Sequence, residues 1–140
     1  MKTINILLLL ASIFILNACT FGIEPIKNES KDLIGNWINP LNVDTLICRF
    51  ERTTALQDTA YGFSIQSDKV FIERKNSGWC GTPPIAYENY KGTWSENDSV
   101  LSITVGYWGG MADYKWKIIS VDDKYLTVYK IKEEFIQKEE

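Results

Sequence analysis

Histidine is absent from this chain of 140 residues, and cysteine, with three copies, is scarce. The lack of histidine excludes Ser–His and Cys–His nucleophilic pairs and the imidazole ligands of most catalytic zinc sites. Basic residues are not in excess, because the formal net charge is −3, and no run of Lys and Arg marks a nucleic-acid partner. Phosphate-binding Gly-rich loops and dinucleotide fingerprints are also missing. We therefore expect no enzyme, no cofactor, no metal and no nucleic acid.

The chain also lacks an apolar run long enough to span a membrane. Its longest run covers residues 4–16, well short of the roughly 20 residues that a spanning helix needs. Lys2 precedes the run, and residues 16–19, Leu-Asn-Ala-Cys, follow it. A charged start, an apolar middle and a small residue before the cut are typical of a secretory signal, so we expect residues 1–18 to be removed.

Residues 16–19 resemble the lipobox of bacterial lipoproteins, in which the cysteine thiol carries diacylglycerol and the acylated cysteine becomes the new N-terminus. The resemblance implies a lipid anchor on Cys19 and a location in the cell envelope, and Thr20 in place of Asp implies the outer membrane. Two or more acyl chains hold a protein stably at a bilayer. The alternative is a signal whose cleavage site merely contains a cysteine. Residues 20–32 are polar and are expected to form a tether between lipid and domain.

With Cys19 assigned to lipid, Cys48 and Cys80 remain as an even pair in an oxidising compartment. We expect a disulfide between them. It would close a loop of about thirty residues and stabilise the domain by roughly 3 to 4 kcal/mol. Two unpaired thiols are the alternative.

Residues 33–132 consist of short runs rich in β-branched and aromatic residues, with no sustained helical period. The runs cover residues 33–38, 45–53, 61–66, 69–75, 87–95, 100–105, 114–121 and 125–132. Several alternate, as where Tyr114 and Trp116 oppose Lys115 and Lys117, so one face is meant for a core. Short polar connections favour hairpins. We predict an all-β fold, an eight-stranded antiparallel up-and-down barrel, with a flattened sandwich as the alternative. Residues 133–140 are expected to form a short polar tail.

Two motifs resemble those of lipocalins. Residues 35–37, Gly-Asn-Trp, match the Gly-x-Trp whose indole closes one end of a lipocalin barrel, and residues 113–114, Asp-Tyr, stand just before the seventh run. The resemblance implies a lipocalin-like domain, as in small lipocalin-like lipoproteins of bacteria. The chain departs from the pattern in its short length, in the missing long helix after the barrel, and in offering Lys130 or Lys132 where lipocalins stack an arginine on the Trp. Residues 92–94, Gly-Thr-Trp, suggest a faint internal repeat.

Carboxylate pairs are available, but none predicts chemistry. Glu73 with Glu51 is expected to lie outward on strands, and Asp122 with Asp123 to form a polar hairpin turn. No partner in the sequence indicates the desolvation that would shift a carboxyl pKa. Residues 96–98 lack the alternating ligand spacing of calcium loops.

The distribution of long connections is the strongest functional signal. In an up-and-down barrel residues 54–60, 76–86 and 106–113 would emerge at one end, and two of these loops mix Trp with Gly and Pro. Aromatic residues on such loops are typical anchors of binding surfaces. Alternatively, Trp79 and Trp108 fold inward and plug the barrel, and Cys80 holds the plug in place. Strand direction favours this alternative, because it places these loops at the Gly-x-Trp end, which is the closed end of a lipocalin barrel.

We expect a membrane-anchored envelope lipoprotein whose barrel binds a small apolar ligand or lipid, unless its own side chains fill the interior. The alternative is a surface interaction protein or hydrolase inhibitor that acts through residues 76–86 and 106–113 on an envelope protein. The candidate binding residues are Trp37, Trp79, Trp94, Tyr107, Trp108 and Trp116.

Overall fold

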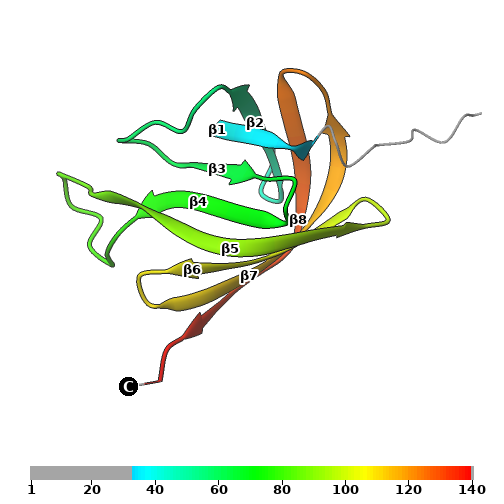
Figure 1. The fold of residues 1–140 in the computed structure, drawn as a ribbon. Helices are drawn as coiled ribbons and strands as arrows, with labels where there is room; N and C mark the ends of the chain where they lie inside the picture. The colour runs from blue at the N-terminus through cyan, green and yellow to red at the C-terminus, as the bar shows by residue number, and fades with distance from the viewer. Residues whose placement is uncertain (1–32, 140) are drawn as a thin grey trace, which may run out of the picture.

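The computed structural model describes residues 33–139. The predicted signal segment, the lipidated Cys19 and the tether lie outside this range and stay predictions. Eight antiparallel strands close into a barrel (Figure 1), which confirms the predicted fold class. The strands are β1 (Gly35–Asn42), β2 (Ile47–Thr53), β3 (Gly62–Ile65), β4 (Val70–Asn76), β5 (Tyr87–Asn97), β6 (Val100–Tyr107), β7 (Gly110–Val121) and β8 (Tyr125–Gln137). No helix within residues 33–139 is long and apolar enough to cross a bilayer.

The order of the first strands differs from a simple meander. β1 lies between β2 and β3, and β2 pairs with β8, so the barrel runs β1-β2-β8-β7-β6-β5-β4-β3. Both β2 and β3 are antiparallel to β1. The connection of residues 54–61 therefore passes β1 and carries the chain from one end of the barrel to the other.

This exchange decides which loops share an end. The connections of residues 43–46, 77–86 and 108–109 lie where β1, β4, β6 and β8 finish, which we call the mouth end. Residues 66–69, 98–99 and 122–124 lie at the opposite end with Gly35, which we call the closed end. Figure 1 shows the β4–β5 and β6–β7 connections on one side and the β5–β6 turn on the other. The prediction that the aromatic loops share the Gly-x-Trp end is therefore wrong, because it assumed that β2 and β3 are antiparallel to each other.

Alternating side chains fill the interior as the sequence pattern predicts. Tyr114, Trp116 and Ile118 of β7 are 5%, 1% and 4% exposed, and the lysines between them face solvent. Leu101, Ile103 and Val105 of β6 are buried in the same way. One face of the ribbon is therefore enclosed by barrel closure, which also removes unpaired edges.

The closed end is solid. Trp37 is fully buried, its indole Nε1 donates to the Leu33 carbonyl at 3.0 Å, and the Arg52 guanidinium lies 4.2 Å from the ring centroid. Arg52 also donates to the Ile34 carbonyl at 2.8 Å. The cation that stacks on this indole thus comes from β2, the neighbour of β1, and not from Lys130 or Lys132 of the last strand.

The last strand is longer than predicted. β8 continues to Gln137 and pairs with β7 as far as Gly110. Residues 133–137 are therefore strand, and the predicted boundary of a polar tail at residue 133 is wrong. The acidic and basic residues at this point suggested a solvated tail, but register with β7 brings Glu133 and Phe135 over the barrel interior.

Candidate functional site

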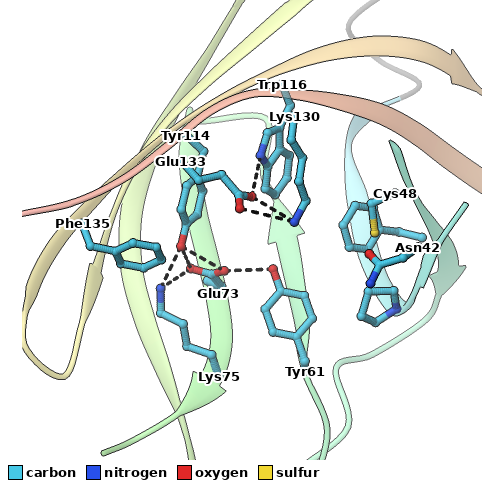
Figure 2. Close-up of a pocket in the computed structure, with 12 residues that line it drawn as sticks. Asn42, Cys48, Tyr61, Glu73, Lys75, Tyr114, Trp116, Lys130, Glu133 and Phe135 are labelled. Atoms are coloured by element: carbon cyan, nitrogen blue, oxygen red, sulfur yellow. Dashed lines mark hydrogen bonds and ion pairs between the residues drawn. The ribbon is translucent and has the colours of Figure 1, made fainter. Parts of the chain in front are cut away.

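The mouth end encloses a cavity of about 370 Å³, so the barrel is filled at one end and open at the other. Its lining comes from the mouth-end halves of β1, β2, β4, β7 and β8 and from the residue before β3 (Figure 2). The lining residues are Pro40, Asn42, Cys48, Phe50, Tyr61, Glu73, Lys75, Tyr114, Trp116, Lys130, Glu133 and Phe135. This volume lies near the lower end of the range for small-molecule pockets.

Aromatic rings form the apolar part of the lining. Tyr114 and Trp116 stack with centroids 5.4 Å apart and planes 6° from parallel. Phe50 stacks with Trp116 at a centroid distance of 5.9 Å, and it packs edge to face with Phe63 of the filled half at 4.8 Å. Such packed rings are held firmly, so this surface is already formed before any ligand arrives.

A buried carboxylate stands at the centre of the polar part. Glu73 of β4 is only 2% exposed, because Phe71, Glu73 and Lys75 share the inward face of that strand. Its oxygens accept from the Tyr61 hydroxyl at 2.9 Å, from the Tyr114 hydroxyl at 3.2 Å, and from the Lys75 ammonium at 2.5 Å. Figure 2 shows these groups converging on Glu73. A buried charge persists when it is paired and hydrogen-bonded in this way.

The two phenols remain donors throughout the physiological range. Burial raises the pKa of Tyr61 well above its ordinary value, and the neighbouring Glu73 carboxylate raises it further. Burial and Glu73 raise the pKa of Tyr114 in the same manner. Because an ionised phenol beside a carboxylate would repel it, each hydroxyl stays protonated and keeps its hydrogen bond to Glu73.

A β-bulge in β8 supplies a second charged pair. Lys115 pairs with Lys132 but Trp116 pairs with Lys130, so Ile131 is an extra residue in the strand. An extra residue resets the alternation of faces. Lys130 and Glu133, three positions apart, therefore both face the cavity, where the ammonium lies 3.2 Å from the carboxylate. Glu133 also accepts from the Trp116 indole at 3.1 Å.

The charges that face the cavity therefore compensate each other in two pairs. Glu73 is neutralised by Lys75 and Glu133 by Lys130. The Lys75 and Glu73 side chains are 15% and 3% exposed, whereas those of Lys130 and Glu133 are 29% and 32% exposed. Solvent exposure of the site thus increases from the Glu73–Lys75 pair to the Lys130–Glu133 pair.

The predicted binding residues separate into three groups. Trp37 and Trp94 are structural, and the Trp94 indole donates to the Gln66 carbonyl at 2.8 Å beneath Lys69. Trp116 lines the cavity. Tyr107, Trp108 and Trp79 lie at the mouth end outside the cavity, with Trp79 81% and Trp108 50% exposed. The alternative prediction that Trp79 and Trp108 plug the barrel is therefore wrong.

The predicted disulfide is not formed. Cys48 is buried on the inward face of β2, and Cys80 is exposed in the loop of residues 77–86. That loop is held by its own hydrogen bonds, since the Ser77 amide donates to the Ala86 carbonyl and the Asn76 side chain donates to the Cys80 carbonyl. Cys80 Sγ lies 2.8 Å from Thr82 Oγ1. The loop closes on itself away from the interior, so the two thiols do not meet.

Sequence reasoning missed most polar residues of the site. Glu73 was predicted to lie outward, but it shares a face with the buried Phe71, and this spacing was the available signal. Lys130 and Glu133 could not be assigned to one face without knowing of the bulge. The polar turn predicted at Asp122 is confirmed, because its carboxylate accepts from the amides of Lys124 and Tyr125, which lowers its pKa.

No protein-family model, curated protein or solved structure matches this chain. Among residues 33–139, no group of three or more His, Cys, Asp and Glu side chains is placed to hold a metal ion.

Proposed function

We propose that this chain binds a small amphipathic molecule in the mouth-end cavity. The observation that carries the proposal is a half-filled barrel, in which a preformed space of about 370 Å³ lies against stacked rings and faces internally paired charges. Ligand pockets combine largely apolar walls with a few placed polar groups in this manner. The rings of Phe50, Trp116 and Phe135 supply contact area, and the phenol and carboxylate groups orient the polar end of the ligand.

The paired charges restrict the ligand class to uncharged or zwitterionic molecules. A ligand with net charge would leave one member of a Glu–Lys pair opposed to it, and an unpaired charge in a sheltered site is costly. A neutral ligand leaves both pairs intact and gains the apolar contacts. We infer that a small uncharged apolar or amphipathic molecule is preferred over a fatty-acid anion.

Binding accounts for the site better than catalysis does. The phenol pKa values are raised, so neither Tyr61 nor Tyr114 acts as a base near neutral pH. The Glu73 carboxylate is occupied by three donors. Groups that already satisfy one another hold a site in shape and are poorly placed to exchange protons with a substrate.

We also propose that the protein is exported and lipid-anchored through Cys19 in the outer membrane of the cell envelope. The sequence of residues 16–19 supports this, together with Thr20. Mass analysis of the purified N-terminus tests it, with a diacylated, N-acylated Cys19 expected. An unmodified N-terminus that retains residues 1–18 would refute the anchor and leave the binding proposal untouched.

Two probes that differ by one charge test the ligand class. N-Phenyl-1-naphthylamine is uncharged, and anilinonaphthalene sulfonate is its anionic counterpart. Titration of the detergent-free protein, followed by probe emission, should give one saturable site for the neutral probe and at least tenfold weaker binding of the anion. Preference for the anion, or saturation with neither, would contradict the proposal.

Neighbouring residues of β8 provide matched variants. Phe135 lines the cavity while Ile136 faces outward, and their exposures are similar at 58% and 49%. Phe135→Ala removes about half of a ring contact, about 1 kcal/mol, and should weaken neutral-probe binding roughly fivefold. Ile136→Ala should leave binding unchanged. Equal effects would place the probe on the outer surface.

A second function, capture of an envelope protein, is favoured by the exposure of Trp79 and Trp108. Solvent-exposed rings on loops are typical hot-spot anchors. This function would use the mouth-end loops and would give the cavity no role. Binding of the neutral probe should then be the same with and without the protein partner.

A further inference from the structure

Exposed apolar side chains are concentrated at the mouth end. They project from each of its connections and from the mouth-end parts of β1, β7 and β8, around the open end of the barrel. We call these residues the rim: Leu41, Val43, Leu46, Trp79, Ile85, Trp108, Met111, Phe135 and Ile136. Phe135 belongs to both the rim and the cavity lining, so the two are continuous.

The closed end has the opposite character. Its three connections carry Asp68, Lys69, Asp98, Asp122, Asp123 and Lys124 and no large apolar residue. The three mouth-end connections, residues 43–46, 77–86 and 108–109, carry a single charged residue, Asp44. The connections named here are thus apolar at the mouth end and charged at the closed end, a difference that core packing does not require because these residues lie outside the core.

We propose that the mouth end docks on the surface of a lipid bilayer, with the indoles of Trp79 and Trp108 in the interfacial region. Indole rings prefer this region because it accepts an apolar body and a polar N–H together. The rim consists of separate side chains on three connections and three strands around an opening. A fluid interface accommodates such side chains one by one, whereas a protein partner needs a continuous complementary surface.

The chain before the barrel is long enough for this orientation. Leu33 lies at the closed end, and the proposed tether of residues 20–32 spans up to roughly 44 Å when extended. The eight residues of β1 span only roughly 26 Å. A barrel anchored through Cys19 can therefore turn its mouth to the membrane that holds it.

Docking of the mouth would also give the cavity direct access to the bilayer, and this consequence rests on the proposed ligand binding. The opening that a bilayer would cover leads past Phe135 to the ring-lined cavity. A membrane-dissolved ligand would then pass between bilayer and cavity without crossing water. The docking itself depends only on the rim.

Tryptophan quenching by brominated lipid tests the docking. All five Trp residues lie between residues 37 and 116, and of these Trp37, Trp94 and Trp116 are buried in the barrel. The purified full chain is incorporated into phosphatidylcholine vesicles, either plain or brominated on the acyl chains. We expect lower emission in the brominated vesicles, and we expect the Trp79→Ala/Trp108→Ala double variant to lose this difference.

Two controls keep the docking separate from folding and from ligand binding. The Trp79→Ala single variant removes the most exposed ring, with no packing at risk, and should lose part of the difference. The Ile119→Ala/Tyr125→Ala variant removes exposed side chains away from the mouth and should keep all of it. Neutral-probe affinity should persist in the Trp double variant, so a failure of docking is distinguishable from a failure of ligand binding.

Three results would overturn the docking. Equal emission in plain and brominated vesicles would show that the rim does not contact lipid. A difference that persists in the double variant would show that another part of the barrel makes the contact. Shielding of Trp79 and Trp108 from aqueous iodide by an envelope protein, without quenching by brominated lipid, would assign the rim to a protein partner.

Discussion

Removal of the Lys75 ammonium should destabilise the barrel through the carboxylate that it leaves behind. Lys75→Met keeps the length of the side chain but removes the charge that lies 2.5 Å from Glu73. Breaking a buried ion pair by removing one partner typically costs 3 to 5 kcal/mol. Tyr61 and Tyr114 still donate to Glu73, and the Lys75 side chain is 15% exposed. We therefore expect a loss of about 2 to 3 kcal/mol at pH 7, roughly 10 °C in Tm.

The penalty comes from the Glu73 carboxylate that is left without its cation, so removing that charge as well should remove most of the penalty. The Glu73→Gln/Lys75→Met double variant carries no buried charge and should recover most of the loss at pH 7.

Urea unfolding followed by far-UV circular dichroism measures these differences. Lys132→Met is the control, because Lys132 lies on the outer face and its partner Glu134 is half exposed, and it should leave the midpoint unchanged. A Lys75→Met variant as stable as wild type at pH 7 would refute the reasoning that Glu73 is a buried, compensated charge.

Three further predictions concern the strands and thiols. Gly92→Ala should cost about 3 kcal/mol or more in urea unfolding, because a Cβ there would meet the Thr104 carbonyl oxygen at 2.1 Å; an unchanged midpoint would show that β5 and β6 part easily. Iodoacetamide should label Cys80 quickly and Cys48 only on unfolding, because Thr82 lowers the pKa of the exposed thiol and burial raises that of Cys48. If neither cysteine is labelled in the unfolded, unreduced protein, the prediction of a disulfide between Cys48 and Cys80 is correct after all. Arg52→Met should lower the free energy of unfolding by about 2 kcal/mol, since the stack on the β1 indole and the hydrogen bond to Ile34 are lost; a neutral effect would contradict the role of Arg52 in closing the barrel.

The sequence predicts the barrel because alternation is a local property. Tyr114, Trp116 and Ile118 recur every second residue, and this pattern alone places them on one face. Strand order is not local. Nothing in residues 54–61 signals that the chain passes β1, so the ends to which the loops belong were assigned wrongly.

The site was harder to predict because it depends on departures from alternation. The bulge at Ile131 turns both Lys130 and Glu133 inward, and a left-handed residue, Asn39 with φ of 50°, interrupts the register of β1 beside Pro40. Each departure adds lining residues that period-two reasoning assigns to solvent or to a tail. Glu73 was missed for a different reason, since its partners come from distant strands.

The indole N–H resonances test the central claim of a ligand site in the mouth-end cavity most directly. A ¹H–¹⁵N spectrum of the protein contains one such signal for each of its five Trp residues. Added N-phenyl-1-naphthylamine should shift the Trp116 signal, because this indole N–H donates a hydrogen bond to Glu133 beside the cavity. The Trp37 and Trp94 signals should stay in place. An unmoved Trp116 signal at saturating probe, or equal shifts of all three, would contradict the account.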